Sequence, residues 1–454
     1  MGMRTPIPAI PQHLSQLIDA LRQRLRDPSF VARHRRQPTD FTRQRTLTFP
    51  VVCLLLLQKT TKSVQRHLHD FLTQWLPEAA APTVTPSAWT QARAKFQPGA
   101  FTELNQGVLL PLAYAPAQAA HRRTWQGHRL LGVDGSVLRL PTTPALTEAF
   151  GQKTVTNQGG ATGTAYPEAR LCVLYDLLND LGVDAQLAPG AVGEVTLALA
   201  QTARLQPGDL LLWDRGFTGF FLMALVQAQA AHFLGRCSRA SFRPAIDLFQ
   251  LDRAGRSVVT TLQAPPELRA ELAARGLPTQ LTVRFVSLRL PTGELEVLVT
   301  SLLEERAYPT DAFLELYHYR WGQETYYGRL KGRLDLEHGS CATETAIRQD
   351  FEATVLVANL ESCLCQPAQA HLDAHRGTRQ HPAQVNRADS YHALKTRLLE
   401  WLAGDAPAET VIRELQPWLL ANPVSVRPQR QVPRRPPSLA RSYQFHRHVR
   451  KTVF

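Results

Sequence analysis

The sequence predicts a multidomain protein with a mixed α/β centre, and three features of the chain support this. A helical pattern fills residues 1–115, strand-like apolar runs begin near residue 125, and a β-rich stretch follows before helices return. A chain of 454 residues is expected to divide, because single cores rarely grow beyond ~250–300 residues. Strands that alternate with helices are typical of an α/β core.

The composition is that of an ordinary folded protein with an excess of positive charge. Hydrophobic residues make up 44% and charged residues 20% of the chain, which is enough apolar material for a sizeable core. The formal net charge of +13 favours a polyanionic partner, because Lys and Arg neutralise phosphates. Ribosome-associated proteins and Arg-rich proteins of high-GC genomes are similarly basic, so the charge identifies no activity.

Cysteine usage and apolar segments predict a reduced, cytoplasmic protein without a membrane partner. The six cysteines form no Cys-x-x-Cys pair and no Cys/His array with zinc spacing. The N-terminus lacks the apolar core of a signal peptide. The longest apolar run, Val51–Leu57, is far shorter than the ~20 residues that cross a bilayer, and we expect it to form a buried helix.

The N-terminal segment is expected to be a helical, DNA-binding domain. Helices are predicted at Pro11–Arg26, from Thr48 onward and at Ser63–Leu76. Thr85-Pro86 supplies an N-cap and an N1 proline for a further helix, and Pro98-Gly99 is expected to end it. An ordinary helical bundle with a solvated basic face fits the same pattern, and no helix-turn-helix signature places a recognition helix.

The α/β core is predicted to begin near residue 125. Its strands are expected at Arg129–Asp134, Ser136–Leu140, Arg170–Tyr175 and Asp209–Trp213. A helix is predicted at Glu194–Leu205, and the Gly/Thr-rich Gly151–Tyr166 is expected to be a mobile loop. Glu194 fits a helix-start residue or an acidic group near an active site, and the first interpretation is favoured.

A β-rich insertion and more helices complete the chain. The insertion has strand-like runs at Val258–Leu262, Leu281–Leu288 and Leu295–Leu302. A long helix is predicted from Asp311, others follow at 344–365 and 390–420, and the Arg/Pro-rich Val424–Phe454 is expected to be a flexible basic arm. The predicted domains are 1–115 (helical), 125–235 (first core part), 236–308 (β insertion), 309–366 (second core part) and 367–454 (helical segment and tail).

One face of the helix predicted from Asp311 carries side chains suited to chemistry. Tyr317, Arg320, Glu324 and Lys331 stand at offsets 0, 3, 7 and 14, so at about 100° per residue they fall within roughly 60° of one another. A surface helix usually mixes charges around its polar side, and a core helix buries leucines there. This face is therefore a candidate site, although a salt-bridged surface face is an open alternative.

Two aspartates end apolar strands. A carboxylate at the end of a central strand can point into a crevice where a cation is held, which makes Asp134 and Asp214 candidate ligands. Taken singly, Asp134-Gly135 also fits a hairpin turn and Asp214 a helix cap. With Glu324 they favour phosphodiester chemistry, in which two Mg²⁺ ions roughly 3.5–4 Å apart activate the attacking oxygen and stabilise the leaving oxygen.

These motifs resemble those of bacterial insertion-sequence DDE transposases of the IS-four group. The spacing Tyr317-(2)-Arg320-(3)-Glu324-(6)-Lys331 matches that group's signature at every position. Asp214-Arg215-Gly216-Phe217 matches its Asp-Arg-Gly-aromatic segment, and Asp134-Gly135-Ser136 fits its first motif. The order Asp, Asp, β insertion, Glu resembles the group's interrupted ribonuclease H-like core over about 125–365.

The resemblance implies a reaction and residue roles. The catalytic residues Asp134, Asp214 and Glu324 would bind two Mg²⁺ ions, which Mn²⁺ can replace. Transposon-end DNA would be contacted by Tyr317, Arg320, Lys331, Trp321 and Arg215. Trp321 would stack on a base, although an aromatic there also fits packing against the sheet. Water would free a 3′-OH that then attacks target DNA, so no catalytic Ser, Cys or His is assigned.

The resemblance also implies the partners. We expect a homodimer that binds double-stranded DNA, both terminal inverted repeats and target, in the bacterial cytoplasm at the nucleoid. Some group members make a DNA hairpin and use a Trp in the insertion, but none lies between Trp213 and Trp321, so no excision route is predicted. A nuclease that does not join DNA and a domesticated, non-catalytic DNA-binding protein are the alternatives. The intact carboxylates argue against the second.

Overall fold

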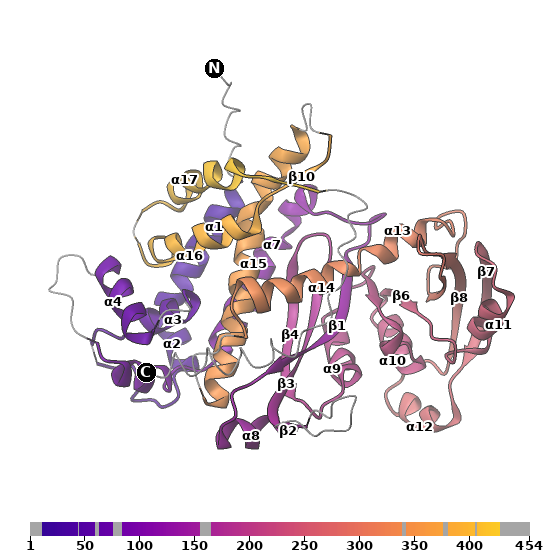
Figure 1. Ribbon diagram of the computed structural model, residues 1–454, viewed down its shortest axis with the longest axis horizontal. Coiled ribbons are helices and arrows are strands. Elements are labelled where there is room, and N and C mark those ends of the chain that lie inside the picture. The colour runs from indigo at the N-terminus through magenta and orange to yellow at the C-terminus, as the bar shows by residue number, and fades with distance from the viewer. Residues whose placement is uncertain are drawn as a thin grey trace. The chain divides into compact units, whose positions relative to one another are not determined.

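The computed structural model describes residues 11–43, 45–59, 63–75, 84–154, 165–337, 342–375, 380–404 and 406–426. They belong to two compact units, each assembled from separate segments of the chain. The first unit comprises Met1–His121, Arg139–Pro167 and Arg329–Phe454, and the second comprises Arg122–Leu138 and Glu168–Gly328. The first is mainly helical, whereas the second contains most of a large mixed sheet (Figure 1).

The N-terminal part of the first unit is helical, as predicted. Its first helices are α1 (Gln12–Arg26), α2 (Pro28–His34), α3 (Phe49–Leu57), α4 (Val64–Trp75) and α5 (Pro86–Arg93). Every residue of Val51–Leu57 is buried, and Thr85 caps α5 by accepting from the Ala88 N–H at 3.2 Å. The expected end at Pro98-Gly99 is wrong, because α5 stops at Arg93. Gly99 instead begins α6 (Gly99–Leu104), since the fixed φ of Pro98 suits the start of a helix.

The rest of the first unit packs around one long helix, α15 (Glu344–Ala374). The other elements are a π-helix at Asn105–Leu109, α7 (Leu110–Ala113), a 3₁₀ helix at Pro116–His121, α8 (Pro144–Phe150), a π-helix at Arg329–Arg333, α16 (Arg387–Ala403) and α17 (Ala408–Ala421). Buried Arg93 joins α5 to α15 by donating to Asp350 at 2.6 Å and Gln349 at 2.7 Å. In the predicted basic arm, Val424–Ser425 form β11, which pairs with β10 (Ala383–Gln384), and residues 427–454 lie outside the described residues.

The sheet brings together strands from distant parts of the chain. Its strands are β1 (Leu130–Arg139), β2 (Gln152–Lys153), β3 (Tyr166–Asp176), β4 (Leu181–Pro189), β5 (Leu210–Trp213), β6 (His232–Arg236), β7 (Arg256–Gln263), β8 (Gln280–Arg289) and β9 (Leu295–Thr300). They are ordered β2-β3-β1-β5-β6-β9-β8-β7, with β4 also paired to β3. The central strands β1, β5 and β6 are parallel, whereas the pairs from β6 through β9 and β8 to β7 are antiparallel.

Several strand predictions are confirmed and two need correction. The strands at β3 and β5 and the three of the β-rich stretch are present, and that stretch also contains α11 (Arg243–Leu251) and α12 (Pro266–Ala274). The two strands predicted at Arg129–Asp134 and Ser136–Leu140 are a single strand, β1, because Asp134-Gly135 continues in extended conformation. Strand β4 was not predicted. Of the loop predicted at Gly151–Tyr166, residues 155–164 lie outside the described residues.

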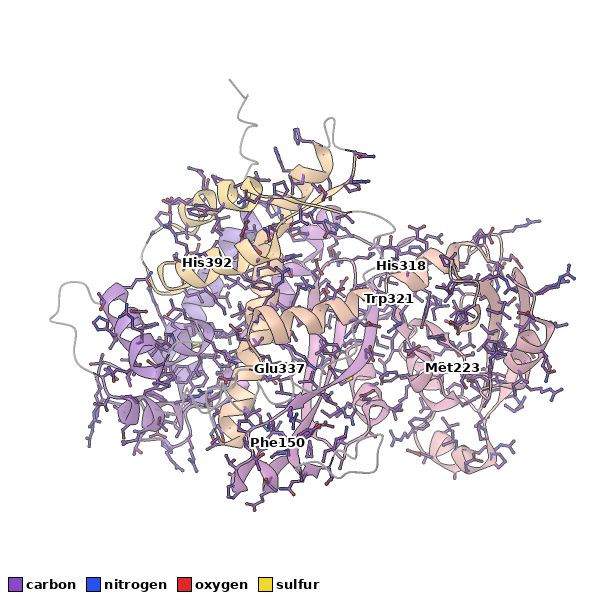
Figure 2. All side chains as sticks on the ribbon, viewed as in Figure 1. Phe150, Met223, His318, Trp321, Glu337 and His392 are labelled. Atoms are coloured by element: carbon purple, nitrogen blue, oxygen red, sulfur yellow. The ribbon has the colours of Figure 1, made fainter. Side chains whose placement is uncertain are left out.

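The core of the second unit lies between its sheet and the helices that cover it. These helices are α9 (Glu194–Gln201), which a 3₁₀ turn extends to Arg204, α10 (Phe220–Ala228), α13 (Ala312–His318) and α14 (Trp321–Gly328). Trp213 of β5 is fully buried, and so is Met223 of α10, which Figure 2 labels. A Cβ at Gly235 would lie 2.2 Å from Nε1 of Trp213, so only glycine leaves room for this ring. The predicted mixed α/β class is thus confirmed.

No helix within the described ranges is long and apolar enough to span a membrane.

Candidate active site

The pairing of β1 with β5 places two of the predicted carboxylates on neighbouring strands. In this parallel pair Val133 is the partner of Trp213, so Asp134 and Asp214 each follow the last paired residue. Strand β1 continues past Asp134, which excludes the hairpin turn, whereas β5 ends at Trp213 and a 3₁₀ turn begins at Arg215. The register of two buried strands therefore positions both aspartates at one place on the sheet.

Asp134 is a largely buried carboxylate whose pKa is dominated by its burial. Its Oδ1 accepts a hydrogen bond from the Gly135 N–H at 2.8 Å, and its Oδ2 lies 3.6 Å from Nη1 of Arg320. Burial raises the pKa of Asp134 to about 6, against the lowering effect of Gly135 and Arg320, and the charges of Glu194 and Asp214 add to the rise. Ionisation of Asp134 is therefore less favourable in the folded protein than in water, and a bound cation would offset this cost.

Asp214 has more cationic and hydrogen-bonding partners. The Tyr317 hydroxyl donates to its Oδ1 at 3.3 Å, and Nη1 of Arg236 lies 3.5 Å from the same oxygen. Burial favours the neutral form, but the Arg215 backbone N–H, Arg320, Arg236 and Tyr317 together lower the pKa of Asp214 below its ordinary value. Burial also raises the pKa of Tyr317, so its hydroxyl remains a donor.

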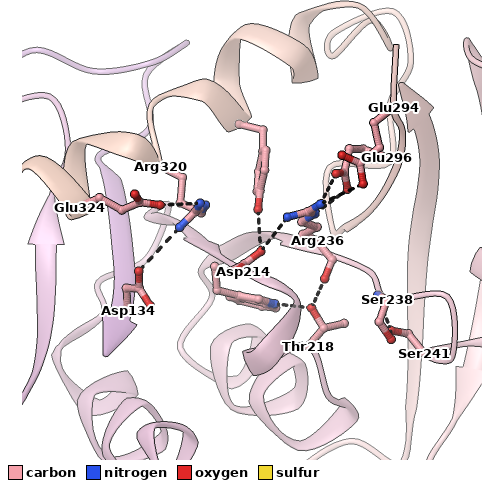
Figure 3. Close-up of polar contacts among 12 residues, drawn as sticks. Asp134, Asp214, Thr218, Arg236, Ser238, Ser241, Glu294, Glu296, Arg320 and Glu324 are labelled. Carbon is pink, nitrogen blue, oxygen red and sulfur yellow. Dashed lines mark hydrogen bonds and ion pairs between the residues drawn. The ribbon is translucent and has the colours of Figure 1, made fainter. Parts of the chain in front are cut away.

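Arg320 joins the first carboxylate to the third. Its Nη2 donates to Oε1 of Glu324 at 3.3 Å, while Nη1 of the same guanidinium faces Asp134 (Figure 3). The Arg320 side chain is 8% exposed and that of Glu324 is 37% exposed. Through Arg320 and Tyr317, the structure brings the three predicted carboxylates to one site within the second unit.

The predicted continuous helix from Asp311 to Lys331 is wrong in its geometry. Helix α13 ends at His318, α14 begins at Trp321, and a π-helix starts at Arg329. The turn between α13 and α14 is tighter than an α-helix, because Arg320 N–H donates to the Tyr317 carbonyl and Gln323 N–H to the Arg320 carbonyl. Tyr317, Arg320 and Glu324 nevertheless converge through the contacts just described.

Helix α14 is fastened to the sheet by two buried side chains. Gln323 donates from Nε2 to the Val173 carbonyl of β3 at 2.8 Å. The Tyr327 hydroxyl donates to the Asp134 carbonyl at 2.6 Å and accepts from the Val173 N–H at 3.0 Å. Tyr327 thus ties the helix that carries Glu324 directly to the backbone of the first aspartate.

Three predicted DNA-contacting residues have different surroundings. Trp321, labelled in Figure 2, is 50% exposed, so it does not pack fully against the sheet. Arg215 is exposed at the start of the 3₁₀ turn after Asp214. Lys331 belongs to the first unit, where its Nζ lies 3.7 Å from Oε1 of Glu337. Their contacts with DNA stay predictions.

Sequence reasoning missed three charged residues beside the carboxylates. Arg236, at the end of β6, contacts Asp214 and forms hydrogen-bonded ion pairs with the buried Glu296 (Figure 3). On the other side, Arg170 of β3 forms an ion pair with Glu194 at the start of α9. Glu194 is the first residue of α9, as favoured, but its side chain also lies against Gly135. The sequence offered one clue to Arg236, which is that a basic residue stands at the end of a strand directly after Gly235.

The donor set suits a hard divalent cation. Three carboxylates supply only oxygen ligands, which Mg²⁺ and Mn²⁺ prefer, and burial raises the pKa of Asp134 despite the nearby charge of Arg320. In the arrangement described, no three acidic, His or Cys side chains among the described residues are grouped closely enough to hold an ion. Arg320 lies between Asp134 and Glu324, so both carboxylates would exchange a guanidinium contact for a metal contact.

Comparisons with known proteins address the family. The model of the transposase DDE domain family matches residues 125–360, which include all three carboxylates. Among solved structures, the chain is similar to a piggyBac transposase synaptic complex with hairpin DNA, determined by cryo-electron microscopy. That similarity has a TM-score of 0.40 and 11% identity, and it covers 94% of this chain and 86% of that chain. None of the curated proteins compared matches this chain.

Proposed function

The chain belongs to the transposase DDE domain family, and from this we propose that it cuts DNA at the ends of a mobile element and joins those ends to target DNA. The substrate would be double-stranded DNA that carries terminal inverted repeats. The spacing of Tyr317, Arg320, Glu324 and Lys331 supports assignment to the IS-four group of bacterial insertion sequences. The mixed sheet, with the parallel strands β1, β5 and β6 beside one another, supports a ribonuclease H-like core.

One observation carries this proposal: three carboxylates from β1, the end of β5 and α14 converge on one buried arginine and one tyrosine. The contacts are Arg320 to Asp134 at 3.6 Å, Arg320 to Glu324 at 3.3 Å, and Tyr317 to Asp214 at 3.3 Å. Each aspartate directly follows a buried apolar strand segment, residues 130–133 for Asp134 and residues 210–213 for Asp214. A carboxylate that served only a surface ion pair would not need this position, whereas a carboxylate that holds a cation beside the sheet would use it.

Asp134, Asp214 and Glu324 would hold two divalent cations, Mg²⁺ or Mn²⁺. When bound, such cations activate the attacking oxygen and stabilise the leaving oxygen of a phosphodiester. The chain's own carboxylates supply the binding charge, and Asp134 must be ionised to take part. Since its pKa is raised to about 6, the reaction is expected to weaken as the pH falls toward 6.

The cationic and aromatic side chains would position DNA at these carboxylates. The two Nη groups of Arg320 contact Asp134 and Glu324, and they would donate to a phosphate when a metal takes their place at these carboxylates. The exposed Arg215 would contact the DNA backbone, and the half-exposed Trp321 would contact a base. Lys331 would add a further phosphate contact.

The reaction would proceed in two steps without a covalent enzyme intermediate. Water attacks the phosphodiester at the transposon end and frees a 3′-OH, and this hydroxyl then attacks a phosphodiester of target DNA. Both steps break one phosphodiester and form one P–O bond, so no Ser, Cys or His nucleophile is required. A homodimer would hold two ends together for joining.

Strand transfer is the test of this proposal. Purified full-length protein, Mg²⁺ and a duplex that carries the element's own terminal repeat should yield joined product. The Glu324→Gln variant should lose both cleavage and joining and keep end binding, since the amide keeps the shape but not the charge. The matched control is Glu315→Gln, because Glu315 is exposed on the neighbouring α13 and contacts Tyr319 instead of the site.

The outcomes separate the alternatives. Joined product that vanishes in Glu324→Gln, but not in Glu315→Gln, supports the transposase. Cleaved ends without joining would identify a nuclease, and end binding without cleavage would identify a non-catalytic DNA-binding protein. Wild-type activity in Glu324→Gln would overturn the assignment of the third carboxylate.

A further inference from the structure

Glu194, the first residue of α9, lies directly against the backbone beside Asp134. A Cβ built on Gly135 would stand 2.2 Å from Cδ and 2.3 Å from Cγ of Glu194, which no real contact allows. Glycine at position 135 is therefore required for the Glu194 side chain to reach this place. The Asp-Gly pair of β1 is explained by a close approach instead of a turn.

Arg170 of β3 fixes the direction of the Glu194 carboxylate. Its Nη1 donates to Oε1 of Glu194, and its Nη2 donates to the Gly190 carbonyl at 3.4 Å. The Arg170 side chain is 21% exposed and that of Glu194 is 32% exposed, so the pair is partly shielded from water. In such surroundings a charge acts on its neighbours more strongly than at an open surface.

We propose that Glu194 is a positioning residue of the active site, whose carboxylate is held by Arg170 against Gly135 and strengthens divalent-cation binding at Asp134. The inference rests on the proposed function, because it takes Asp134 as a metal ligand. Glu194 acts through its charge and need not touch the cation. Without a cation, the negative charges of Glu194 and Asp134 repel each other. When a cation binds at Asp134, both carboxylates attract it, so the charge of Glu194 favours the cation-bound state.

A purely structural role for Glu194 predicts something different. If the role were purely structural, Glu194 would only stabilise the first turn of α9 slightly and accept a hydrogen bond from Arg170. A neutral residue that accepts from Arg170 would then serve almost as well. Gln at position 194 keeps the size of the side chain and an oxygen for Arg170, and it removes only the charge. A charge effect on cation affinity therefore distinguishes the two roles.

The test is cation binding by the full-length protein without DNA. The melting temperature is measured against Mn²⁺ concentration, because a cation that binds the folded state raises it, and isothermal titration calorimetry with Mn²⁺ gives an independent midpoint. Glu194→Gln should raise the Mn²⁺ concentration at half-maximal stabilisation roughly tenfold. Glu194→Asp keeps the charge and should recover most of the affinity. Glu267→Gln removes an exposed acid from the first turn of α12, and should leave the midpoint unchanged.

Each outcome decides the question. A wild-type midpoint in Glu194→Gln would overturn the inference, as would equal losses in Glu194→Gln and Glu194→Asp or failure of Glu194→Gln to fold, since these indicate a structural role. The metal site of the proposed function would instead be contradicted if Mn²⁺ does not stabilise the wild-type protein, or if the Asp134→Asn variant is stabilised equally. A rise in the midpoint confined to Glu194→Gln supports the inference.

Discussion

Asp134 and Asp214 stand at equivalent positions on two paired strands, and their carboxyl groups differ in electrostatic character. Burial raises the pKa of Asp134 to about 6, whereas the partners around Asp214 lower its pKa despite burial. Asp214 contacts the side chains of Arg236 at 3.5 Å and Tyr317 at 3.3 Å. Asp134 accepts the Gly135 N–H at 2.8 Å and lies 3.6 Å from Arg320, and it also faces the charge of Glu194. The strand register sets where a carboxylate lies, and the neighbouring elements set its charge.

The difference suggests a division of labour between the two aspartates. The partners of Asp214 outweigh the effect of burial on its pKa, whereas Arg320 offsets only part of that effect at Asp134, so Asp134 would gain more from an added cation. Arg320 is the residue that acts on both, because its charge lowers the pKa of each. Changes at Arg320, at the aspartates and at the exposed Arg215 should therefore have effects of decreasing size.

Arg320→Ala should have the largest effect. It removes the contacts to Asp134 and Glu324, raises the pKa of both aspartates and deletes an expected phosphate contact. We expect DNA cleavage at saturating Mg²⁺ to fall by a factor of about 100 to 1,000, measured on the terminal-repeat duplex. Arg320→Lys keeps the positive charge but not the planar guanidinium, so its cleavage rate should lie between those of the wild type and Arg320→Ala. Equal rates for all three proteins would contradict the role of Arg320.

Replacing the two aspartates by asparagine should change stability in opposite directions. The raised folded-state pKa of Asp134 means that the folded protein holds a proton that the unfolded chain has lost, so stability falls as pH rises from 3.8 to about 6. Asp134→Asn should therefore stabilise the protein by about 2–3 kcal/mol at pH 7.5 without metal. The lowered pKa of Asp214 contributes stability above pH 3.8 that is lost as pH falls through the folded value, so Asp214→Asn should destabilise.

Urea unfolding in EDTA at pH 7.5 measures this pair. The same experiment at pH 4 is the control, because there Asp134 is protonated in the folded wild type and most of the gain from Asp134→Asn should disappear. Shifts of the same sign at pH 7.5 would contradict the comparison.

Arg215→Ala should have the smallest effect. The Arg215 side chain is exposed, and alanine keeps the backbone N–H that acts on Asp214, so folding and cation binding should be unchanged. Loss of one phosphate contact should weaken binding to all DNA sequences similarly and reduce the slope of log affinity against log salt by about 1. Fluorescence anisotropy at several salt concentrations measures that slope, and an unchanged slope would remove Arg215 from the DNA contacts.

The sequence predicts the elements of this site better than their geometry. Apolar runs before Asp134 and Asp214 locate both strands, because buried parallel strands are continuous apolar segments. The periodicity of apolar residues could not show the tight turn at Arg320. The backbone hydrogen bonds there reach back three residues instead of four, and this change leaves the helical pattern of the sequence unaltered. The single strand β1 was divided in the prediction because Asp-Gly favours turns, and only the approach of Glu194 explains that glycine.

Long-range ion pairs were beyond sequence reasoning. Arg236 reaches Asp214 and Glu296 because β6 lies between β5 and β9 in the sheet, and this order joins segments far apart in the chain. Arg170 meets Glu194 for a similar reason, since β3 and α9 are brought together only by folding. A basic residue at a strand end has many uses, and local pattern does not select among them.

The central claim is that Asp134, Asp214 and Glu324 form one metal-dependent catalytic site. It is tested most directly by Mg²⁺-dependent cleavage of the terminal-repeat duplex with the three isosteric variants Asp134→Asn, Asp214→Asn and Glu324→Gln, each shown to be folded and to bind the duplex. The account predicts that every variant loses cleavage while Glu315→Gln retains it. Wild-type cleavage by any one of the three folded variants would contradict it.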